Sequence, residues 1–212
     1  MSTFKTEQEA FWHGQFGDDY VARNKSQELL SSKVALFAKI LGRAKVVNSA
    51  IEFGSNIGLN LFAVKTLLPN CEVSSIEINE KAAGELKERY SHAYGEDIRV
   101  YNQSILEWDV DYQRELSIIS GVLIHINPDE LKAVYKKLYD ASTKYISICE
   151  YYNPTPVEVT YRGHEGKLFK RDWAGEILDM YPDLRLVDYG FVYHRDNIFP
   201  QDDATWFLLE KI

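Results

Sequence analysis

The sequence is poor in cysteine and in long apolar runs, and each shortage excludes a class of protein. Only Cys71 and Cys149 occur among 212 residues, both inside apolar stretches, which favours buried thiols in a reducing compartment over a disulfide or a metal clip. The longest apolar runs, such as residues 118–126, contain polar residues and are too short to span a bilayer, and residues 1–16 contain no apolar signal-peptide segment. We therefore expect a soluble, cytoplasmic protein with no membrane partner and no metal.

Positive charge is scarce as well. Lys and Arg total 24 against 32 Asp and Glu, which gives a formal net charge of −8. Such a chain repels a polyanion unless its cations gather on one face, so we do not expect a nucleic-acid partner. The content of 45% hydrophobic and 26% charged residues is ordinary for a globular protein. No repeat, low-complexity tract or Gly/Ser linker divides the chain, so we predict a single domain with appendages.

Short apolar runs rich in Ile and Val alternate with helix-like patterns through the middle of the chain. The apolar runs are typical of strands buried on both faces of a sheet, and they cover residues 46–53, 72–77, 98–101, 116–120 and 145–150. The helix-like patterns carry polar residues on one side and cover residues 59–68, 80–90 and 129–141. Strand, helix and strand in succession imply crossover connections, so we predict an α/β fold with a mostly parallel sheet between helices.

The two ends of the chain differ from its middle. Residues 184–194 and 205–211 are extended stretches with a loop between them, which predicts an antiparallel hairpin at the edge of the sheet. Residues 6–24, which precede a helix-like segment at 27–41, carry a stripe of aromatic side chains at helical spacing: Phe11, Trp12, Phe16 and Tyr20. Such a stripe is typical of core packing, and the alternative is a helical lid that folds over a ligand.

The most informative segment is residues 51–60, where an apolar strand runs into glycines and then into a helix. In a parallel sheet this junction lies at the carboxyl edge, where ligands bind. A dinucleotide site needs Gly-x-Gly-x-x-Gly, but this turn has Gly54 and Gly58 with Asn56 between them. A methyl-donor site instead needs an acid at the strand end, here Glu52, and a second acid at the next strand end, here Glu77, to accept the ribose hydroxyls. The pattern favours a nucleoside-type ligand over a plain structural turn.

Several motifs together resemble those of the Rossmann-like S-adenosylmethionine-dependent methyltransferases. They are residues 52–60, 76–79 and 120–126, and this resemblance covers roughly residues 46–150. Residues 11–24, 151–156, 161–172 and 202–211 look more specifically like the methylases encoded with pseudaminic acid biosynthesis, a nonulosonate sugar pathway. The resemblance implies a seven-stranded sheet with a reversed terminal hairpin. It also implies a helical N-terminal cap at 1–45, a donor-binding core at 46–150, and an acceptor loop with the hairpin at 151–212.

The same resemblance implies which residues hold the methyl donor. It places S-adenosylmethionine against residues of the glycine turn and of the next two loops: Glu52, Gly54, Asn56, Gly58, Glu77, Ile78 and Gly121. The family usually has an acid after the third strand for the adenine amino group, and residues 102–105 depart from that pattern. Ser104 or Gln103 is then expected to bond adenine, with Ile105 as a stacking wall. At the front, Arg23 is a candidate for the donor's carboxylate, and Trp12 and Tyr20 are expected to exclude water.

Three residues are candidates for proton transfer. A sugar hydroxyl is a weak nucleophile that needs a general base near neutral pKa. His125 follows the fourth strand, Glu150 ends the fifth, and His164 lies in the loop beyond it. Each has a plain alternative, because a buried histidine often bonds to backbone, and a carboxylate at a strand end often caps a turn.

Residues 151–172 contain a local excess of cations in an acidic chain. They are either a solvated basic loop or a cradle for an anionic acceptor, and the candidate ligands are Tyr151, Tyr152, Asn153, Arg162, Lys167, Lys170 and Arg171. We therefore predict methyl transfer to a small anionic sugar-related acceptor, a nonulosonate or its nucleotide-activated form, at oxygen. The open alternatives are a silent donor-binding module, a nicotinamide-dependent oxidoreductase, and a methyltransferase acting on a nitrogen or protein acceptor. The oligomeric state is left open.

Overall fold

A seven-stranded sheet forms the centre of the protein. The computed structural model describes residues 4–23 and 27–212, without the side chains of Ala22 and Arg23. The sheet has the order β3-β2-β1-β4-β5-β9-β8. Its strands are β1 (Ser49–Phe53), β2 (Glu72–Ile76), β3 (Arg99–Tyr101), β4 (Arg114–Ser120), β5 (Ser142–Glu150), β8 (Leu184–Val192) and β9 (Ala204–Lys211). The first five strands in sequence pair in parallel, and β9 pairs antiparallel with both β5 and β8. This confirms the predicted mostly parallel sheet with a reversed terminal hairpin.

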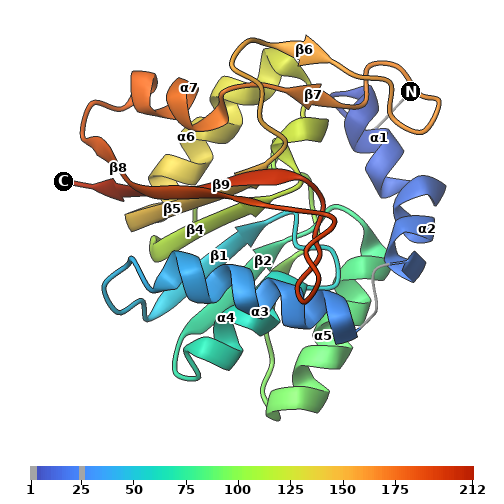
Figure 1. The fold of residues 1–212 in the computed structure, drawn as a ribbon. Helices are drawn as coiled ribbons and strands as arrows, with labels where there is room; N and C mark the ends of the chain where they lie inside the picture. The colour runs from blue at the N-terminus through green and yellow to red at the C-terminus, as the bar shows by residue number, and fades with distance from the viewer. Residues whose placement is uncertain (1–3, 24–26) are drawn as a thin grey trace.

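Helices cover both faces of this sheet (Figure 1). One face packs against α3 (Gln27–Leu41), α4 (Leu59–Leu67) and α5 (Glu80–Tyr94) through side chains such as Phe37, Leu61 and Leu86. The other face packs against α6 (Leu131–Ala141) and α7 (Trp173–Met180), with Trp173 fully buried. The alternating apolar runs of the sequence therefore form strands that are buried on both sides, as their Ile and Val content predicted.

The N-terminal helices lie beyond the carboxyl ends of the parallel strands. Helices α1 (Glu7–His13) and α2 (Gln15–Arg23) stand there as a cap (Figure 1). Helix α1 begins with a capping box, in which Thr6 and Glu9 bond to each other's backbone N–H groups. The cap is fastened to the loop after β2, because Asn79 Nδ2 donates to Asp18 Oδ1 at 2.9 Å. The predicted helical lid is thus a pair of short helices.

Five short elements were not expected from the sequence. Strands β6 (Val157–Glu158) and β7 (Phe169–Lys170) pair antiparallel within the basic segment. Helix α7 follows, capped by Asp172, whose Oδ1 accepts from the N–H of Gly175 at 3.0 Å. Two 3-10 turns, η1 (Leu123–His125) and η2 (Pro128–Glu130), come after β4. Strands of two residues carry no readable alternation, which explains why a loop was predicted for residues 151–172.

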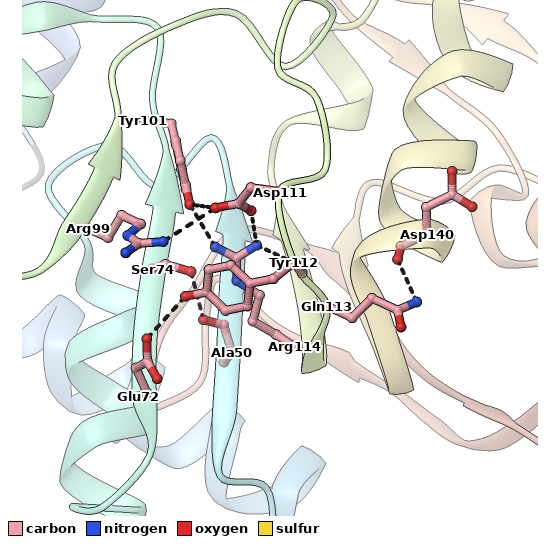
Figure 2. A network of polar contacts seen from close by, with 10 residues as sticks. All are labelled: Ala50, Glu72, Ser74, Arg99, Tyr101, Asp111, Tyr112, Gln113, Arg114 and Asp140. Atoms are coloured by element: carbon pink, nitrogen blue, oxygen red, sulfur yellow. Dashed lines mark hydrogen bonds and ion pairs between the residues drawn. The ribbon is translucent and has the colours of Figure 1, made fainter.

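A buried arginine organises the start of β4 (Figure 2). Arg114 is 1% exposed, and its Nη1 donates to Asp111 Oδ1 and to the carbonyl of Tyr112, both at 2.7 Å. Its guanidinium lies 3.6 Å from the centre of the Tyr112 ring, and Nη2 donates to Tyr101 Oη at 3.0 Å. The network continues to β2, since Tyr112 Oη donates to Glu72 Oε1 at 3.1 Å. It therefore ties three strands together.

Candidate functional site

A cavity of about 690 Å³ opens at the carboxyl ends of the parallel strands. Its floor comes from β1, β4 and β5 and the loops after β1, β2 and β3, and the cap and the loop before β9 form its walls. The strand order reverses between β1 and β4, because β1 leads to β2 on one side while β4 and β5 continue on the other. Open α/β sheets bind ligands at such a reversal. The volume lies within the range of about 300–1,000 Å³ that is usual for small-molecule sites.

The glycine turn after β1 forms the centre of the floor. Gly54 and Gly58 have φ angles of +73° and +81°, and Asn56 has +50°. A Cβ atom on Gly54 would lie 2.6 Å from Cγ2 of Val122, so both the backbone conformation and the space require glycine there. The turn ends at Gly58, where α4 begins; residues 54–57 line the cavity, whereas Gly58, a predicted donor-binding residue, does not. Asn56 lies between these two glycines, and it adopts the left-handed conformation that asparagine tolerates.

Glu52 is a buried carboxyl group with one unsatisfied oxygen. Its side chain lines the cavity although the residue is only 1% exposed. Asn60 Nδ2 donates to Oε1 at 2.6 Å, and Oε2 has no partner. Burial raises the pKa of Glu52 to about 8, while the bond from Asn60 and the charge of Lys33 act in the opposite direction. Oε2 is thus an acceptor that a ligand can satisfy.

Glu77 stands at the next strand end and is held by backbone. The N–H of Asn56 donates to Oε2 at 2.6 Å and that of Asn79 to Oε1 at 2.8 Å. Burial raises the pKa of Glu77, and these N–H bonds oppose the rise. Parallel pairing sets Glu52 opposite Ser75 and Phe53 opposite Ile76. The two carboxyl groups therefore come to one floor, as the sequence predicted from their places at successive strand ends.

The loop after β3 closes one end of the cavity. Ile78, Ser104 and Ile105 line it here, and both residues of the β3 loop are buried. Gln103, the alternative adenine contact, does not line the cavity. The hydroxyl of Ser104 instead bonds to Oε1 of Glu9, a buried carboxylate that arrives from α1.

Glu150 occupies the opposite side of the glycine turn. The N–H groups of Val122 and Leu123, which follow Gly121, donate to its Oε1 at 2.9 Å each. Its Oε2 has no partner, and the residue lines the cavity. Burial raises the pKa of Glu150 to about 7, against the lowering effect of these N–H bonds and of Lys33. A carboxyl group with this pKa exchanges a proton near neutrality.

His125 lines the cavity as a neutral imidazole. Its Nδ1 lies 2.5 Å from the carbonyl oxygen of Lys167. Since a carbonyl only accepts, Nδ1 carries the proton and Nε2 is left as an acceptor. Burial lowers the pKa of His125 to about 4. The ring packs 4.7 Å from that of Trp12 and 4.9 Å from that of Tyr161, so His125 is well positioned but weakly basic.

His164 lies outside the cavity. It is exposed, and its ring packs 5.1 Å from that of Phe11 on the cap. The wall of the cavity on this side consists of Trp12, Tyr20 and Tyr161. The structure thus places Trp12 and Tyr20 where the lid prediction put them. The prediction for Arg23 falls on a side chain outside the described residues.

Most candidate acceptor residues of the basic segment, residues 151–172, lie away from the cavity. Tyr151 and Arg162 line it, whereas the other five candidate acceptor residues do not: Tyr152, Asn153, Lys167, Lys170 and Arg171. Lys167 Nζ lies 3.1 Å from Glu7 Oε2, and Arg171 Nε lies 2.7 Å from Glu176 Oε1.

The remaining members of the segment also have neighbours of their own. Lys170 Nζ lies 5.4 Å from the centre of the Tyr151 ring. Asn153 Nδ2 donates to the carbonyl of Thr155 at 2.6 Å. Tyr152 forms an isolated parallel β-bridge with Arg171. Most of the local cation excess is therefore matched by acids and rings elsewhere in the fold.

Sequence reasoning missed several residues on the cavity wall. They come from the cap, from α3, from α4 and from the loop before β9: Gln8, Glu9, Lys33, Asn60, Gln201 and Asp202. The capping-box spacing of Thr6 and Glu9 was a readable signal, although it pointed only to a helix start. The described residues that line the cavity include five with carboxyl groups but only two Lys or Arg side chains, Lys33 and Arg162. The cavity is thus acidic.

No family model matches the sequence, and no curated protein matches it. Solved structures do match its fold. A magnesium protoporphyrin IX methyltransferase from Synechocystis PCC 6803 with bound S-adenosylmethionine has a TM-score of 0.69 at 13% identity, over 100% of both chains. A 1,6-didemethyltoxoflavin-N1-methyltransferase from Burkholderia thailandensis, with its substrate and S-adenosylhomocysteine bound, has a TM-score of 0.71 at 14% identity, over 96% of this chain and 86% of that one.

A third match gives the same architecture. The N-methyltransferase NodS from Bradyrhizobium japonicum WM9, in complex with S-adenosylhomocysteine, has a TM-score of 0.65 at 13% identity, over 91% of this chain and 97% of that one. Likeness at these identities concerns the fold. The chain therefore has the Rossmann-like fold found in S-adenosylmethionine-dependent methyltransferases.

Proposed function

We propose that this protein is an S-adenosylmethionine-dependent methyltransferase that acts on a small molecule, and one observation carries the proposal. In the described part of the chain, nine buried side-chain polar atoms lack a hydrogen-bond partner. Six of them are oxygens of cavity-lining residues: Gln8, Glu52, Asn56, Asn60, Glu150 and Gln201. Buried acceptors without donors are costly. The ligand must therefore bring several donors, and S-adenosylmethionine carries an ammonium group, two ribose hydroxyls, an amino group and a cationic sulfur.

Different residues of the floor would bind different groups of this ligand. Glu52 Oε2 would accept from the ammonium group and Glu77 from the ribose hydroxyls, with the turn from Gly54 to Gly58 beneath them. Ile78 and Ile105 offer apolar walls for the adenine ring. The donor's carboxylate would meet a cation, and Lys33 is the described one beside Glu52, with Arg23 as the earlier candidate.

When bound, S-adenosylmethionine supplies a methyl group already activated on a cationic sulfur. The protein's own task is alignment and the exclusion of water, which we assign to the aromatic wall of Trp12 and Tyr20. Glu150 fits the role of base, because its Oε2 is unpaired and its pKa is about 7. His125, with a pKa near 4, would instead orient an acceptor hydroxyl through Nε2.

For the acceptor we propose a small anionic sugar-related molecule of the nonulosonate class, methylated at oxygen. The support is the sequence resemblance to pseudaminic acid methylases and the position of Arg162, whose guanidinium can pair with a carboxylate or phosphate. The free, buried state of Cys71 and Cys149 suits a cytoplasmic setting. Among the described residues, no helix has the length and apolar character needed to cross a membrane.

A second acceptor class, an amine, is favoured by the acidic wall. Glu150 and Asp202 both line the cavity, where Lys33 and Arg162 are the described Lys and Arg side chains. An amine also needs less help from a base than a hydroxyl does.

The test is product mass. Purified protein is incubated with isotope-labelled S-adenosylmethionine and a panel of free and cytidylyl-activated nonulosonates, each also in its amino form. The proposal predicts label on a nonulosonate oxygen, with Arg162→Ala raising KM at least about tenfold and Arg185→Ala, on the distant edge strand, leaving it unchanged. Label on nitrogen selects the second class. Binding of the donor without label on any acceptor would overturn the enzymatic proposal.

A further inference from the structure

Glu9 is a buried carboxylate that the fold brings to the cavity from a distant part of the sequence. It lies on α1, is 7% exposed and lines the cavity. Its Oε2 accepts from the N–H of Thr6 at 2.7 Å and from Thr6 Oγ1 at 3.0 Å. Its Oε1 accepts from the hydroxyl of Ser104, which is 95 residues away in the sequence. A carboxylate can accept about four hydrogen bonds, so Oε1 has room for another donor.

The sheet order gives the direction in which a nucleoside would lie. Strands β1, β2 and β3 are neighbours in that order and bring Glu52, Glu77 and Ser104 to the same floor. A nucleoside with its ribose at Glu77 and its charged tail at Glu52 therefore extends its base toward the loop after β3. That loop contributes no ionised group of its own between residues 102 and 106, and Asn102 is used to bond the carbonyls of Glu77 and Ile78. Glu9 is the carboxylate at this end.

We propose that Glu9 accepts a hydrogen bond from the 6-amino group of the bound purine, so that α1 selects adenosyl over 6-oxo nucleosides. This inference rests on the proposed methyl-donor site. An amino group at position 6 donates, whereas a 6-oxo group presents a lone pair that a carboxylate repels. A site built to receive a donor rejects the analogue that lacks it. The cap thus takes part in recognising the donor as well as covering it.

The contact also links recognition to closure of the cap. Helix α1 is held in place by Gln8 Nε2, which donates to the carbonyl of Gly166 at 2.8 Å, and by the pair of Lys5 with Glu130 at 2.7 Å. The first contact joins α1 to residues 151–172, and the second joins Lys5, which precedes α1, to η2. Selection of the purine therefore depends on α1, a helix that also contacts residues 151–172.

Two ligands that differ in the 6-substituent, and with it in the proton on N1, give the test: S-adenosylhomocysteine and S-inosylhomocysteine, titrated by calorimetry into the full-length protein. The native protein is expected to prefer the adenosyl compound about thirtyfold, which corresponds to roughly 2 kcal/mol at 1.4 kcal/mol per factor of ten. Glu9→Gln should reduce the preference to below about threefold, because an amide can donate to the 6-oxo group. Glutamine also satisfies a capping box, so α1 keeps its start.

The matched control is Glu7→Gln, on the same helix with a side chain 89% exposed, and it should keep the native preference. Melting temperatures of both variants check that they are folded. If Glu9→Gln binds both ligands with the native preference, the inference is wrong while the methyl-donor site stands. If the native protein binds neither ligand, the proposed function itself fails, and this inference fails with it.

Discussion

Replacing Glu52 by glutamine tests the electrostatic basis of the site. Burial raises the pKa of Glu52 from its ordinary value of 4.5 to about 8. Between these values the unfolded chain has released the proton and the folded protein retains it, so this residue's contribution to stability falls as pH rises through that window. Each pKa unit corresponds to about 1.4 kcal/mol, and the cost therefore reaches about 3 kcal/mol at pH 7. The buried carboxyl group of Glu52, which we propose binds a cationic group, therefore lowers the free energy of unfolding at neutral pH.

Glu52→Gln should remove this cost. The free energy of unfolding is expected to rise by up to about 3 kcal/mol at pH 7 and to stay near its native value at pH 4. The new amide has a partner, because Asn60 Oδ1 is unpaired. Affinity for S-adenosylhomocysteine should fall about thirtyfold, because the ligand's ammonium group favours the ionised form of Glu52, and glutamine cannot ionise. Urea unfolding from pH 4 to 8 and calorimetric titration measure the two effects.

Glu115→Gln is the matched control. The pKa of Glu115 is lowered, chiefly by its bond from Lys144, so its contribution to stability is lost only as pH falls toward acid values. This variant should keep the native slope between pH 6 and 8 and the native affinity. The reasoning is refuted if Glu52→Gln shows the native pH slope, or if it binds S-adenosylhomocysteine as tightly as the native protein.

Three further outcomes follow from the geometry. Gly54→Ala should lower the free energy of unfolding by about 2 kcal/mol in urea titrations, because its φ of +73° and the 2.6 Å approach to Val122 both disfavour a side chain. Glu150→Gln should reduce kcat for a hydroxyl acceptor by about a hundredfold or more and abolish the rise in rate that its pKa of about 7 predicts around neutrality, with donor affinity kept; an unchanged pH–rate profile would exclude it as the base. Arg114→Leu should cost about 3 kcal/mol of stability, because it removes a buried cation's bonds to Asp111, to the Tyr112 carbonyl and to Tyr101 Oη, while a loss of donor affinity would contradict its placement away from the site.

The sheet was predictable because its strands lie in sequence-local patterns. Ile- and Val-rich runs alternating with helical periods specify crossovers, and crossovers specify parallel strands. The floor of the site was predictable for the same reason. Glu52 and Glu77 stand at strand ends, and parallel pairing brings such ends to one edge whatever the rest of the chain does.

The walls of the site were not predictable, because tertiary packing decides them. Glu9 meets Ser104 across 95 residues, and no local pattern encodes that meeting. Lys167 and Arg171 looked like free cations in sequence, but the fold supplies Glu7 and Glu176 as partners. A charge excess in a segment is therefore a weak guide to a binding site until the partners from other elements are known.

The central claim is that two acids at neighbouring strand ends hold an adenosyl nucleoside, and a crystal structure of the complex with S-adenosylhomocysteine tests it most directly. We predict that the ribose hydroxyls lie within hydrogen-bond distance of the Glu77 carboxylate, and the amino group within hydrogen-bond distance of Glu52 Oε2. An S-adenosylhomocysteine molecule bound elsewhere, or a cavity that stays empty at saturating ligand, would contradict the claim.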